Sequence, residues 1–208
     1  MLAIVDYDMG NLRSVQKAFA LLNCPARIVT QPEDVLQADR LVLPGVGAFA
    51  DAMKTLQQTG LGDAVRDFIR TGRPFLGICL GLQLLMEVGY EDGRHAGLGV
   101  IGGDCVRLTV DQPPWNLKVP HMGWNALNFP AVGPLFKNVP AGSYVYFVHS
   151  YHVQPVQPGL IAATTDYGGP VVAAICRDNV MATQFHPEKS QSAGLALLRN
   201  FSAWNGAF

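Results

Sequence analysis

One stretch near the middle of the chain, residues 74–86, constrains the fold more than any other. It reads Pro-Phe-Leu-Gly-Ile-Cys-Leu-Gly-Leu-Gln-Leu-Leu-Met. An apolar run typical of a buried strand stops at a Gly-x-Cys-x-Gly turn, and apolar residues at helical spacing begin at once. The pattern predicts a strand, a sharp turn and a helix, with Cys79 held on the turn as in a nucleophile elbow. Glycine suits both flanks, since it tolerates strained backbone angles and leaves room for a substrate.

Cys79 itself has two interpretations. The unpaired N–H groups and the dipole of the following helix would stabilise a thiolate, which makes this residue a candidate nucleophile. Cysteine is also among the most buried residue types, so an inert core thiol fits the same pattern. The chain has 4 cysteines, without the dense spacing or the C-x-x-C pairs of a disulfide framework or a zinc site. We therefore expect no metal site, and the motif alone leaves the reactivity of Cys79 open.

The first half of the sequence alternates between predicted strands and helices. We expect strands at residues 2–7, 26–30 and 40–43, and helices from about residue 11 and at residues 32–38, 49–58 and 62–71. Such alternation is typical of a doubly wound parallel sheet, in which ligands bind beyond the carboxyl ends of the strands. The loop Pro44-Gly45-Val46-Gly47 and Cys79 would both lie there.

The second half changes character. Short β-like runs occur at residues 104–110, 123–129, 143–149, 160–166 and 171–177, and an apolar helix is predicted at residues 193–204. Turns rich in Pro and Gly separate these runs, which indicates antiparallel or mixed sheet. The sequence therefore predicts an α/β fold with a doubly wound, mostly parallel central sheet flanked by helices, and an added antiparallel or mixed sheet. Because no internal repeat or linker is visible, we expect residues 1–208 to form a single domain.

Composition narrows the class of partner. The chain is 49% hydrophobic and 15% charged with a formal net charge of -1, which gives no bulk attraction to nucleic acid or to an anionic membrane. The first residues run straight into a strand instead of a signal peptide, and no apolar run is long enough to span a bilayer. We expect a soluble cytoplasmic protein that acts on a small molecule or works with a protein partner.

A glycine motif at residues 97–102 invites a cofactor interpretation. It reads Gly-Leu-Gly-Val-Ile-Gly and matches the dinucleotide-binding fingerprint letter for letter. That fingerprint requires a strand before it and a helix after it, whereas this motif follows a polar loop and precedes a strand-like run. We interpret it as a turn between strands and expect no nucleotide cofactor.

The segment His186-Pro187-Glu188 is a candidate source of a general base. In extended chain, residues two apart lie on one side, so the carboxylate could hydrogen-bond one imidazole nitrogen and leave the other facing a nucleophile. With Cys79, these two residues would complete the logic of a catalytic triad, which depends on geometry and not on chain order. The alternative is structural: His186 would begin a helical turn, with Glu188 in its first turn where the dipole favours an acid.

Several motifs together carry a family resemblance. The elbow, the Pro44-Gly45-Val46-Gly47 loop and the His186-Pro187-Glu188 segment resemble the class I, triad-type glutamine amidotransferases. Residues 6–15, 44–49, 118–125 and 146–151 are similar, more narrowly, to the glutaminase subunits of imidazole glycerol phosphate synthase. The likeness runs from the first predicted strand to the last helix. Asp8 departs from the family pattern, which has glycine there, but Asp tolerates a positive φ and the turn is expected to survive.

The resemblance implies a Cys-His-Glu triad. The Cys79 thiolate would attack the side-chain amide carbon of glutamine, His186 would pass a proton to the leaving ammonia, and Glu188 would orient the imidazole. A thioester would form, and water would release glutamate without any cofactor. The resemblance gives a further group of residues one shared task, to bind the glutamine and its oxyanion: Val46, Gly47, Leu80, Gln83, Ser150 and Tyr151.

The resemblance also implies a partner. Free ammonia would be protonated and lost in water, so it would pass to a cyclase subunit with a (β/α)8 barrel fold, in a heterodimer. That subunit would make imidazole glycerol phosphate and aminoimidazole carboxamide ribotide. Surface residues expected to face the barrel are Asn11, Arg13, His121, Trp124 and Lys189.

Two rival functions stay open from the sequence. One is another amidotransferase of the same fold, serving pyridoxal phosphate or purine synthesis; the motif at residues 118–125 argues against it. The other is a non-catalytic binding module in which Cys79 is an inert thiol.

Overall fold

The computed structural model of the protein describes residues 1–129 and 133–207. Its central sheet is built from β1 (Leu2–Val5), β2 (Ala26–Val29), β3 (Arg40–Gly45), β4 (Phe75–Cys79), β11 (Ile161–Asp166), β12 (Pro170–Arg177) and β13 (Val180–Thr183). Within the described residues these seven strands lie in the order β11-β12-β13-β4-β3-β1-β2. The run from β13 to β2 is parallel, and β12 and β11 continue it antiparallel. The strands β1, β4 and β13 are short, mostly apolar and buried throughout, as strands covered on both faces must be, whereas the edge strand β2 exposes Arg27.

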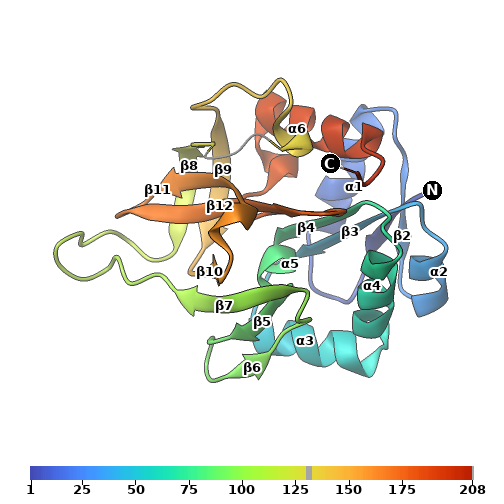
Figure 1. Ribbon diagram of the computed structural model, residues 1–208, viewed down its shortest axis with the longest axis horizontal. Helices are drawn as coiled ribbons and strands as arrows, with labels where there is room; N and C mark the ends of the chain where they lie inside the picture. Colours follow the sequence, from blue (N-terminus) through green and yellow to red (C-terminus); the bar gives the residue numbers. More distant parts are fainter. Residues whose placement is uncertain (130–132, 208) are drawn as a thin grey trace.

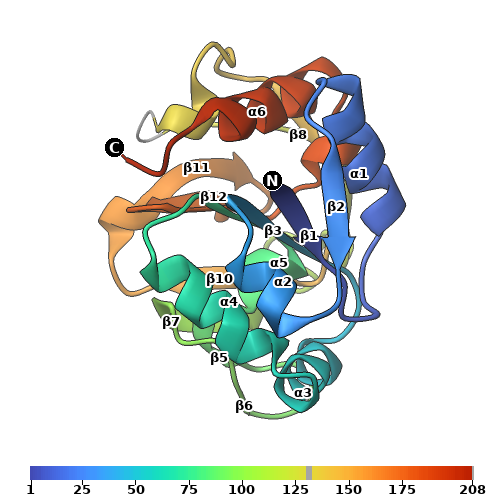
Figure 2. The ribbon, with the colours of Figure 1, turned by 90° about the vertical axis from the view of Figure 1, so that its right-hand side faces the viewer.

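Helices cover both faces of this sheet. They are α1 (Leu12–Leu21), α2 (Pro32–Leu36), α3 (Phe49–Gln58), α4 (Leu61–Arg70), α5 (Leu80–Gln83) and α6 (Gln191–Ala203), with short 3-10 helices η1 (Pro134–Phe136), η2 (Pro158–Leu160) and η3 (Pro187–Lys189). Figure 2 shows α1 and α6 on one face, where Phe19 and Phe201 pack with their ring centroids 6.3 Å apart. The other face carries α2, α3 and α4, whose Phe68 is fully buried. Across the part of the chain that is described, every helix is too short or too polar to cross a membrane.

Two smaller sheets adjoin the central one (Figure 1). The first consists of β5 (Met86–Gly89), β6 (His95–Ala96), β7 (Ile101–Arg107) and β10 (Tyr151–Pro155), in the order β10-β7-β5-β6. The second pairs β8 (His121–Ala126) with β9 (Tyr144–His149), antiparallel. Cys105 of β7 and Val153 of β10 belong to the same apolar cluster as Ala3 of β1 and Leu41 of β3. Val145 of β9 belongs to a second apolar cluster with Ile4 of β1, so each added sheet packs against the central one.

The expected fold class is confirmed: the protein is α/β, with a large, mostly parallel sheet flanked by helices and additional mixed and antiparallel sheets. The predicted helix at residues 49–58 coincides with α3, and the glycine motif at residues 97–102 is a turn that runs into β7. Asp8 has a φ of 64°, so the turn survives its departure from glycine as expected.

The helix predicted after the elbow is present but short. Helix α5 ends at Gln83, and the apolar residues beyond it enter β5 at Met86. Leu82, Leu84 and Leu85 are all fully buried. A segment that is apolar on every side fits a core strand as well as a helix, and pairing with β6 and β7 decides between them.

Candidate active site

The candidate site lies where three neighbouring parallel strands end. Gly45 at the end of β3 stands opposite Cys79 at the end of β4, and Thr183 of β13 stands opposite Ile78. The loop after β3, the elbow after β4 and the segment after β13 therefore leave the sheet at the same edge. This is the edge of the sheet at which we predicted, from the sequence, that a ligand binds.

The elbow is strained at the cysteine itself. Cys79 has φ 55° and ψ -107°, a conformation that non-glycine residues rarely adopt and that functional sites often hold. The flanking glycines Gly77 and Gly81, by contrast, do not have positive φ, so the expectation of strained backbone angles at them was wrong. They are needed for space: a Cβ on Gly81 would collide with the carbonyl oxygen of Leu43, and one on Gly77 would lie 2.8 Å from the carbonyl oxygen of Gly81. The strand and α5 can approach closely only with glycine at both positions.

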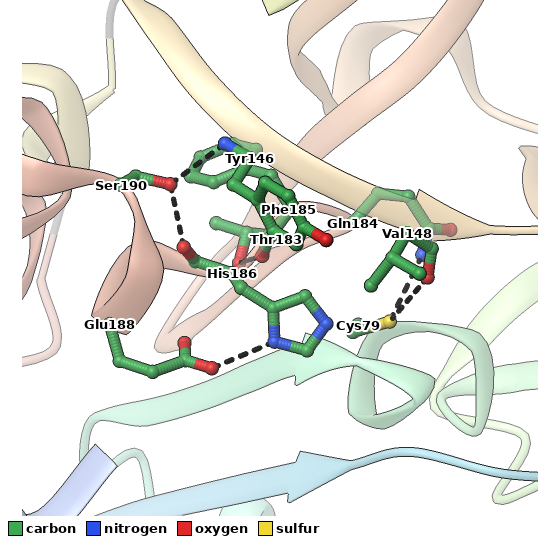
Figure 3. A network of polar contacts seen from close by, with 9 residues as sticks. All are labelled: Cys79, Tyr146, Val148, Thr183, Gln184, Phe185, His186, Glu188 and Ser190. Atoms are coloured by element: carbon green, nitrogen blue, oxygen red, sulfur yellow. Dashed lines mark hydrogen bonds and ion pairs between the residues drawn. The ribbon is translucent and has the colours of Figure 1, made fainter. Parts of the chain in front are cut away.

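His186 and Glu188 form a buried pair. Nδ1 of His186 lies 2.8 Å from Oε1 of Glu188, and their side chains are 2% and 1% exposed. A carboxylate only accepts, so Nδ1 carries a proton and donates it. Within residues 1–129 and 133–207, Nε2 of His186 has no hydrogen-bond partner, and Figure 3 shows it pointing toward Cys79. The two geometries expected of the motif occur together, since η3 begins at Pro187 and the His186–Glu188 pair forms on this turn.

A short network fixes the histidine in place (Figure 3). The backbone N–H of His186 donates to the carbonyl of Tyr146 at 3.0 Å, and the hydroxyl of Ser190 donates to the carbonyl of His186 at 2.6 Å. The N–H of Tyr146 in turn donates to the Ser190 hydroxyl at 3.0 Å. The imidazole is thus anchored to β9 as well as to η3.

The surroundings of His186 favour its protonated form. Burial by itself lowers its pKa, but Cys79 and Glu188 outweigh burial and raise the pKa to about 9. At neutral pH an imidazolium is therefore favoured beside the cysteine. A positive charge next to a thiol is the arrangement that activates a cysteine nucleophile.

A cavity of about 340 Å³ opens at Cys79, at the small end of the range for ligand pockets. Its lining includes every residue predicted for substrate and oxyanion binding: Val46, Gly47, Leu80, Gln83, Ser150 and Tyr151. Two larger cavities, of about 420 and 500 Å³, lie away from Cys79 and are lined in part by arginines. We place the site at the smaller cavity because it alone of these contains the cysteine.

Two residues of the site were missed by the sequence interpretation. Gln184 is fully buried, and its Nε2 lies 3.7 Å from Sγ of Cys79 while its Oε1 accepts from Nε2 of Gln83 at 3.2 Å. Glu91 lines the cavity, and its Oε2 accepts from the N–H of Phe49, the first residue of α3, at 2.7 Å. The one sequence signal for Gln184 was its position two residues before His186. Glu91 stands in a polar loop, and nothing in the sequence marked it as a site residue.

The described part of the chain gives no sign of a metal centre. In these residues, no three His, Cys, Asp or Glu side chains gather so that they could hold a metal ion. The four cysteines are free thiols, and Cys105 and Cys176 have pKa values raised above the ordinary range, chiefly by burial.

The residues expected at a partner interface divide into two groups. Trp124 is 45% exposed and packs edge-on against Tyr146, with ring centroids 6.1 Å apart, and the ammonium of Lys189 lies 5.7 Å from the centroid of that tyrosine. Arg13 is exposed and Asn11 is half-buried. These four positions can meet a partner.

His121 does not belong with them, because it is only 3% exposed. Its Nδ1 lies 3.0 Å from Nε2 of His149, whose Nδ1 donates to the carbonyl of Tyr151 at 2.9 Å. Burial lowers the pKa of His121 to about 4 and that of His149 to about 3, so both rings are neutral. His121 thus faces the interior, against the expectation of a surface contact.

Comparisons with known proteins agree with this geometry. Residues 3–203 match the family described as "Glutamine amidotransferase class-I". The chain is 52% identical over 202 residues to imidazole glycerol phosphate synthase subunit HisH of Rhodopirellula baltica, with 97% of each chain covered. It is 53% identical over 203 residues to the HisH subunit of Syntrophotalea carbinolica, covering 97% of this chain and 98% of that one. The HisH subunit of Aquifex aeolicus is 50% identical over 199 residues, with 95% and 94% covered.

Solved structures share the fold at low sequence identity. A structure of PurLQS from Thermotoga maritima has a TM-score of 0.76 at 14% identity and covers 96% of each chain. A glutamine amidotransferase from the same organism has a TM-score of 0.66 at 16% identity, covering 96% of this chain and 95% of that one. With a family match over almost all of its length and half of its residues shared with these subunits, the chain belongs to the class-I glutamine amidotransferase family, among the imidazole glycerol phosphate synthase subunits HisH.

Proposed function

We propose that this chain hydrolyses glutamine to glutamate and ammonia as the glutaminase subunit of an imidazole glycerol phosphate synthase, in histidine biosynthesis. The observation that carries the proposal is that Cys79, His186 and Glu188 lie together at one end of the sheet. Nδ1 of His186 lies 2.8 Å from Glu188, and its Nε2 points toward the cysteine. The HisH relatives support the pathway, since they are named as subunits of that synthase.

The reaction begins at Cys79. Its thiolate attacks the side-chain amide carbon of glutamine, and the imidazolium of His186 donates the Nε2 proton to the departing nitrogen. The C–N bond breaks, ammonia leaves and a thioester remains. His186, now neutral, accepts a proton from water as that water attacks the thioester, and glutamate is released with the thiolate restored. Glu188 keeps Nδ1 protonated throughout, so Nε2 is the nitrogen that exchanges the proton.

The oxyanion formed in each step needs two donors. The N–H of Leu80, at the first position of α5, supplies one next to the nucleophile. The second comes from the Val46-Gly47 loop, which lines the same cavity and in which Gly47 has a φ of 105°. Such a loop can turn its peptide planes at low cost, because glycine adopts either sign of φ.

The rest of the cavity binds the amino-acid end of glutamine. Gln83 is held there by its Nε2, which donates to the carbonyl of Tyr151 at 2.9 Å. The backbone of Ser150 and Tyr151 offers hydrogen bonds to the substrate, and the carboxylate of Glu91 suits its ammonium group.

The ammonia goes to a partner. In water it would be protonated and lost as a nucleophile, so we propose transfer through the protein to a cyclase subunit of (β/α)8 barrel fold in a heterodimer. The surface that receives this subunit comprises Asn11, Arg13, Trp124 and Lys189. Exposed tryptophan beside a cation and a tyrosine has the composition typical of interface centres.

Two wider expectations go with this function. We propose that residues 1–208 act as one amidotransferase domain, supported by the two apolar clusters that join each smaller sheet to the central sheet. We also propose that the protein works in the cytoplasm, where its biosynthetic relatives would find glutamine and the nucleotide substrate of the partner.

The test separates glutamine use from cyclase function. The complex of this chain with its cyclase subunit is assayed with glutamine and, separately, with an ammonium salt. Cys79→Ala should abolish synthesis from glutamine and leave synthesis from ammonium unchanged, whereas Cys24→Ala, at a thiol outside the site, should leave both unchanged. Loss of both activities in Cys79→Ala would show that the residue supports the fold or the interface instead.

A further inference from the structure

Tyr7 carries a buried hydroxyl for which the mechanism has so far no use. The residue lies two positions after the end of β1 and is 2% exposed. Among the residues that the structure describes, its Oη has no hydrogen-bond partner. Buried polar groups are nearly always paired, so one left single in a well-packed core needs an explanation.

The hydroxyl of Tyr7 lies against the Pro44-Gly45-Val46-Gly47 loop, which supplies one of the proposed oxyanion donors. A Cβ built on Gly45 would collide with Oη of Tyr7 and would lie 2.9 Å from Cβ of Leu80. Oη therefore lies between the end of β3 and the start of α5. The loop after β3 and the first residue of α5 supply the proposed oxyanion donors. Gly45 stands opposite Cys79 in the sheet, so the hydroxyl is also close to the nucleophile.

The turn after β1, which contains Met9 and Gly10, also packs against this loop. Cε of Met9 would lie 2.7 Å from a Cβ on Gly47, and Cγ of Pro44 would lie 3.7 Å from a Cβ on Gly10. The turn therefore approaches the loop at two points besides Tyr7, with Met9 near Gly47 and Gly10 near Pro44. Tyr7 does not line the 340 Å³ cavity, and its hydroxyl lies against Gly45, where β3 leads into the loop.

Peptide geometry says what the hydroxyl can do there. The N–H and the C=O of one trans peptide point in opposite directions. When a peptide of the loop turns its N–H toward the cavity to bind the oxyanion, its C=O must turn away from the cavity, into the protein. A carbonyl that turns into a buried site needs a donor, and Oη of Tyr7 is a donor on that side.

We propose that Tyr7 is a positioning residue of the glutaminase site, whose hydroxyl donates to the loop carbonyl that turns inward when the oxyanion hole forms. This inference rests on the proposed function. Burial raises the pKa of Tyr7 far above the ordinary range, and the charge of Cys79 adds to the effect, so the hydroxyl keeps the proton it would donate. Tyr7 touches neither substrate nor thiol and acts only through the loop.

The test uses Tyr7→Phe in the complex with the cyclase subunit. The variant keeps the ring and removes only the hydroxyl; Tyr90→Phe, at a tyrosine that is 44% exposed, is the matched control. One neutral hydrogen bond shifts a two-state equilibrium by about fivefold to tenfold, so kcat for glutamine should fall by about that factor. We expect KM for glutamine, synthesis from ammonium and the control to be unchanged. The Tm of Tyr7→Phe should be unchanged or higher, because the hydroxyl has no partner among the described residues to lose.

Three outcomes would overturn the inference. An unchanged kcat would show that the hydroxyl does not serve the loop. A fall in kcat that comes with a lower Tm would assign Tyr7 a structural role instead. A raised KM at constant kcat would place its effect on substrate binding. If the wild-type complex itself failed to hydrolyse glutamine, the proposed function would fall first, and that result is distinct from these three.

Discussion

Replacing Glu188 by glutamine removes the charge from the His186 pair and keeps its shape. The carboxylate accepts from Nδ1 at 2.8 Å, and both side chains are nearly inaccessible to water. A hydrogen bond to a charged group contributes about 1.5 to 3 kcal/mol, so the imidazolium of the variant loses that much stabilisation. Each 1.36 kcal/mol is tenfold in rate, and kcat for glutamine should fall about 10- to 100-fold.

Loss of the charged hydrogen bond between Glu188 and His186 also shifts the pH dependence of kcat. The pKa of His186 is about 9 in the wild type, and losing the pair lowers it by about one to two pH units. The alkaline limb of kcat, measured from pH 6.5 to 9 and beyond, should shift down with it. Glu33→Gln, at an exposed position in α2, is the control and should change neither quantity. A Glu188→Gln complex with wild-type kcat and an unshifted limb would refute the role of this carboxylate.

Three other predictions concern stability and assembly. The pKa values of His121 and His149, about 4 and about 3, lie below the unfolded value of 6.5, so the stability they confer is complete above pH 6.5 and is lost as the pH falls toward 4. For His121 alone the loss reaches about 3 kcal/mol, to be measured by urea unfolding across that window; a flat profile would contradict it. Gly81→Ala should lower the free energy of unfolding by about 1 to 3 kcal/mol or prevent folding, because its Cβ meets a backbone carbonyl that cannot move aside, whereas Gly159→Ala, with open space around it, should be neutral. Trp124→Ala should weaken binding of the cyclase subunit about tenfold or more in titration calorimetry, with the free chain as stable as before; equal affinity would exclude this surface.

The parts of the fold that sequence reasoning reached were those whose signals are local. Strand β4 is a continuous apolar run, the elbow is marked by two glycines, and α3 has apolar residues at helical spacing. Strands β5, β6, β10 and β13 were missed, and each has five residues or fewer. Strands β1, β2 and β4 are as short but were predicted, since each falls in an alternating strand–helix pattern; for the missed strands, partners far away in the chain decide whether they form.

The site divides in the same way. The cysteine, histidine and glutamate were predicted because motifs mark them, and the cavity gathers the substrate residues that the resemblance implied. Gln184 and Tyr7 were not predicted, because only their surroundings in the folded structure distinguish them from core residues. A tyrosine that closely follows a buried strand is usually a core residue. What distinguishes this one is a hydroxyl that no described residue pairs with, and its contact with Gly45.

The backbone at Cys79 also limits which nucleophile the elbow can hold. With φ at 55°, a side chain branched at Cβ would clash with its own main chain, so threonine is excluded although its hydroxyl could in principle attack an amide. Serine and cysteine fit, and of these the thiol is the one that an adjacent imidazolium readily ionises at neutral pH. The choice between hydroxyl and thiol chemistry is therefore made partly by a dihedral angle, and a threonine at this position would fail for reasons of shape before reactivity came into play.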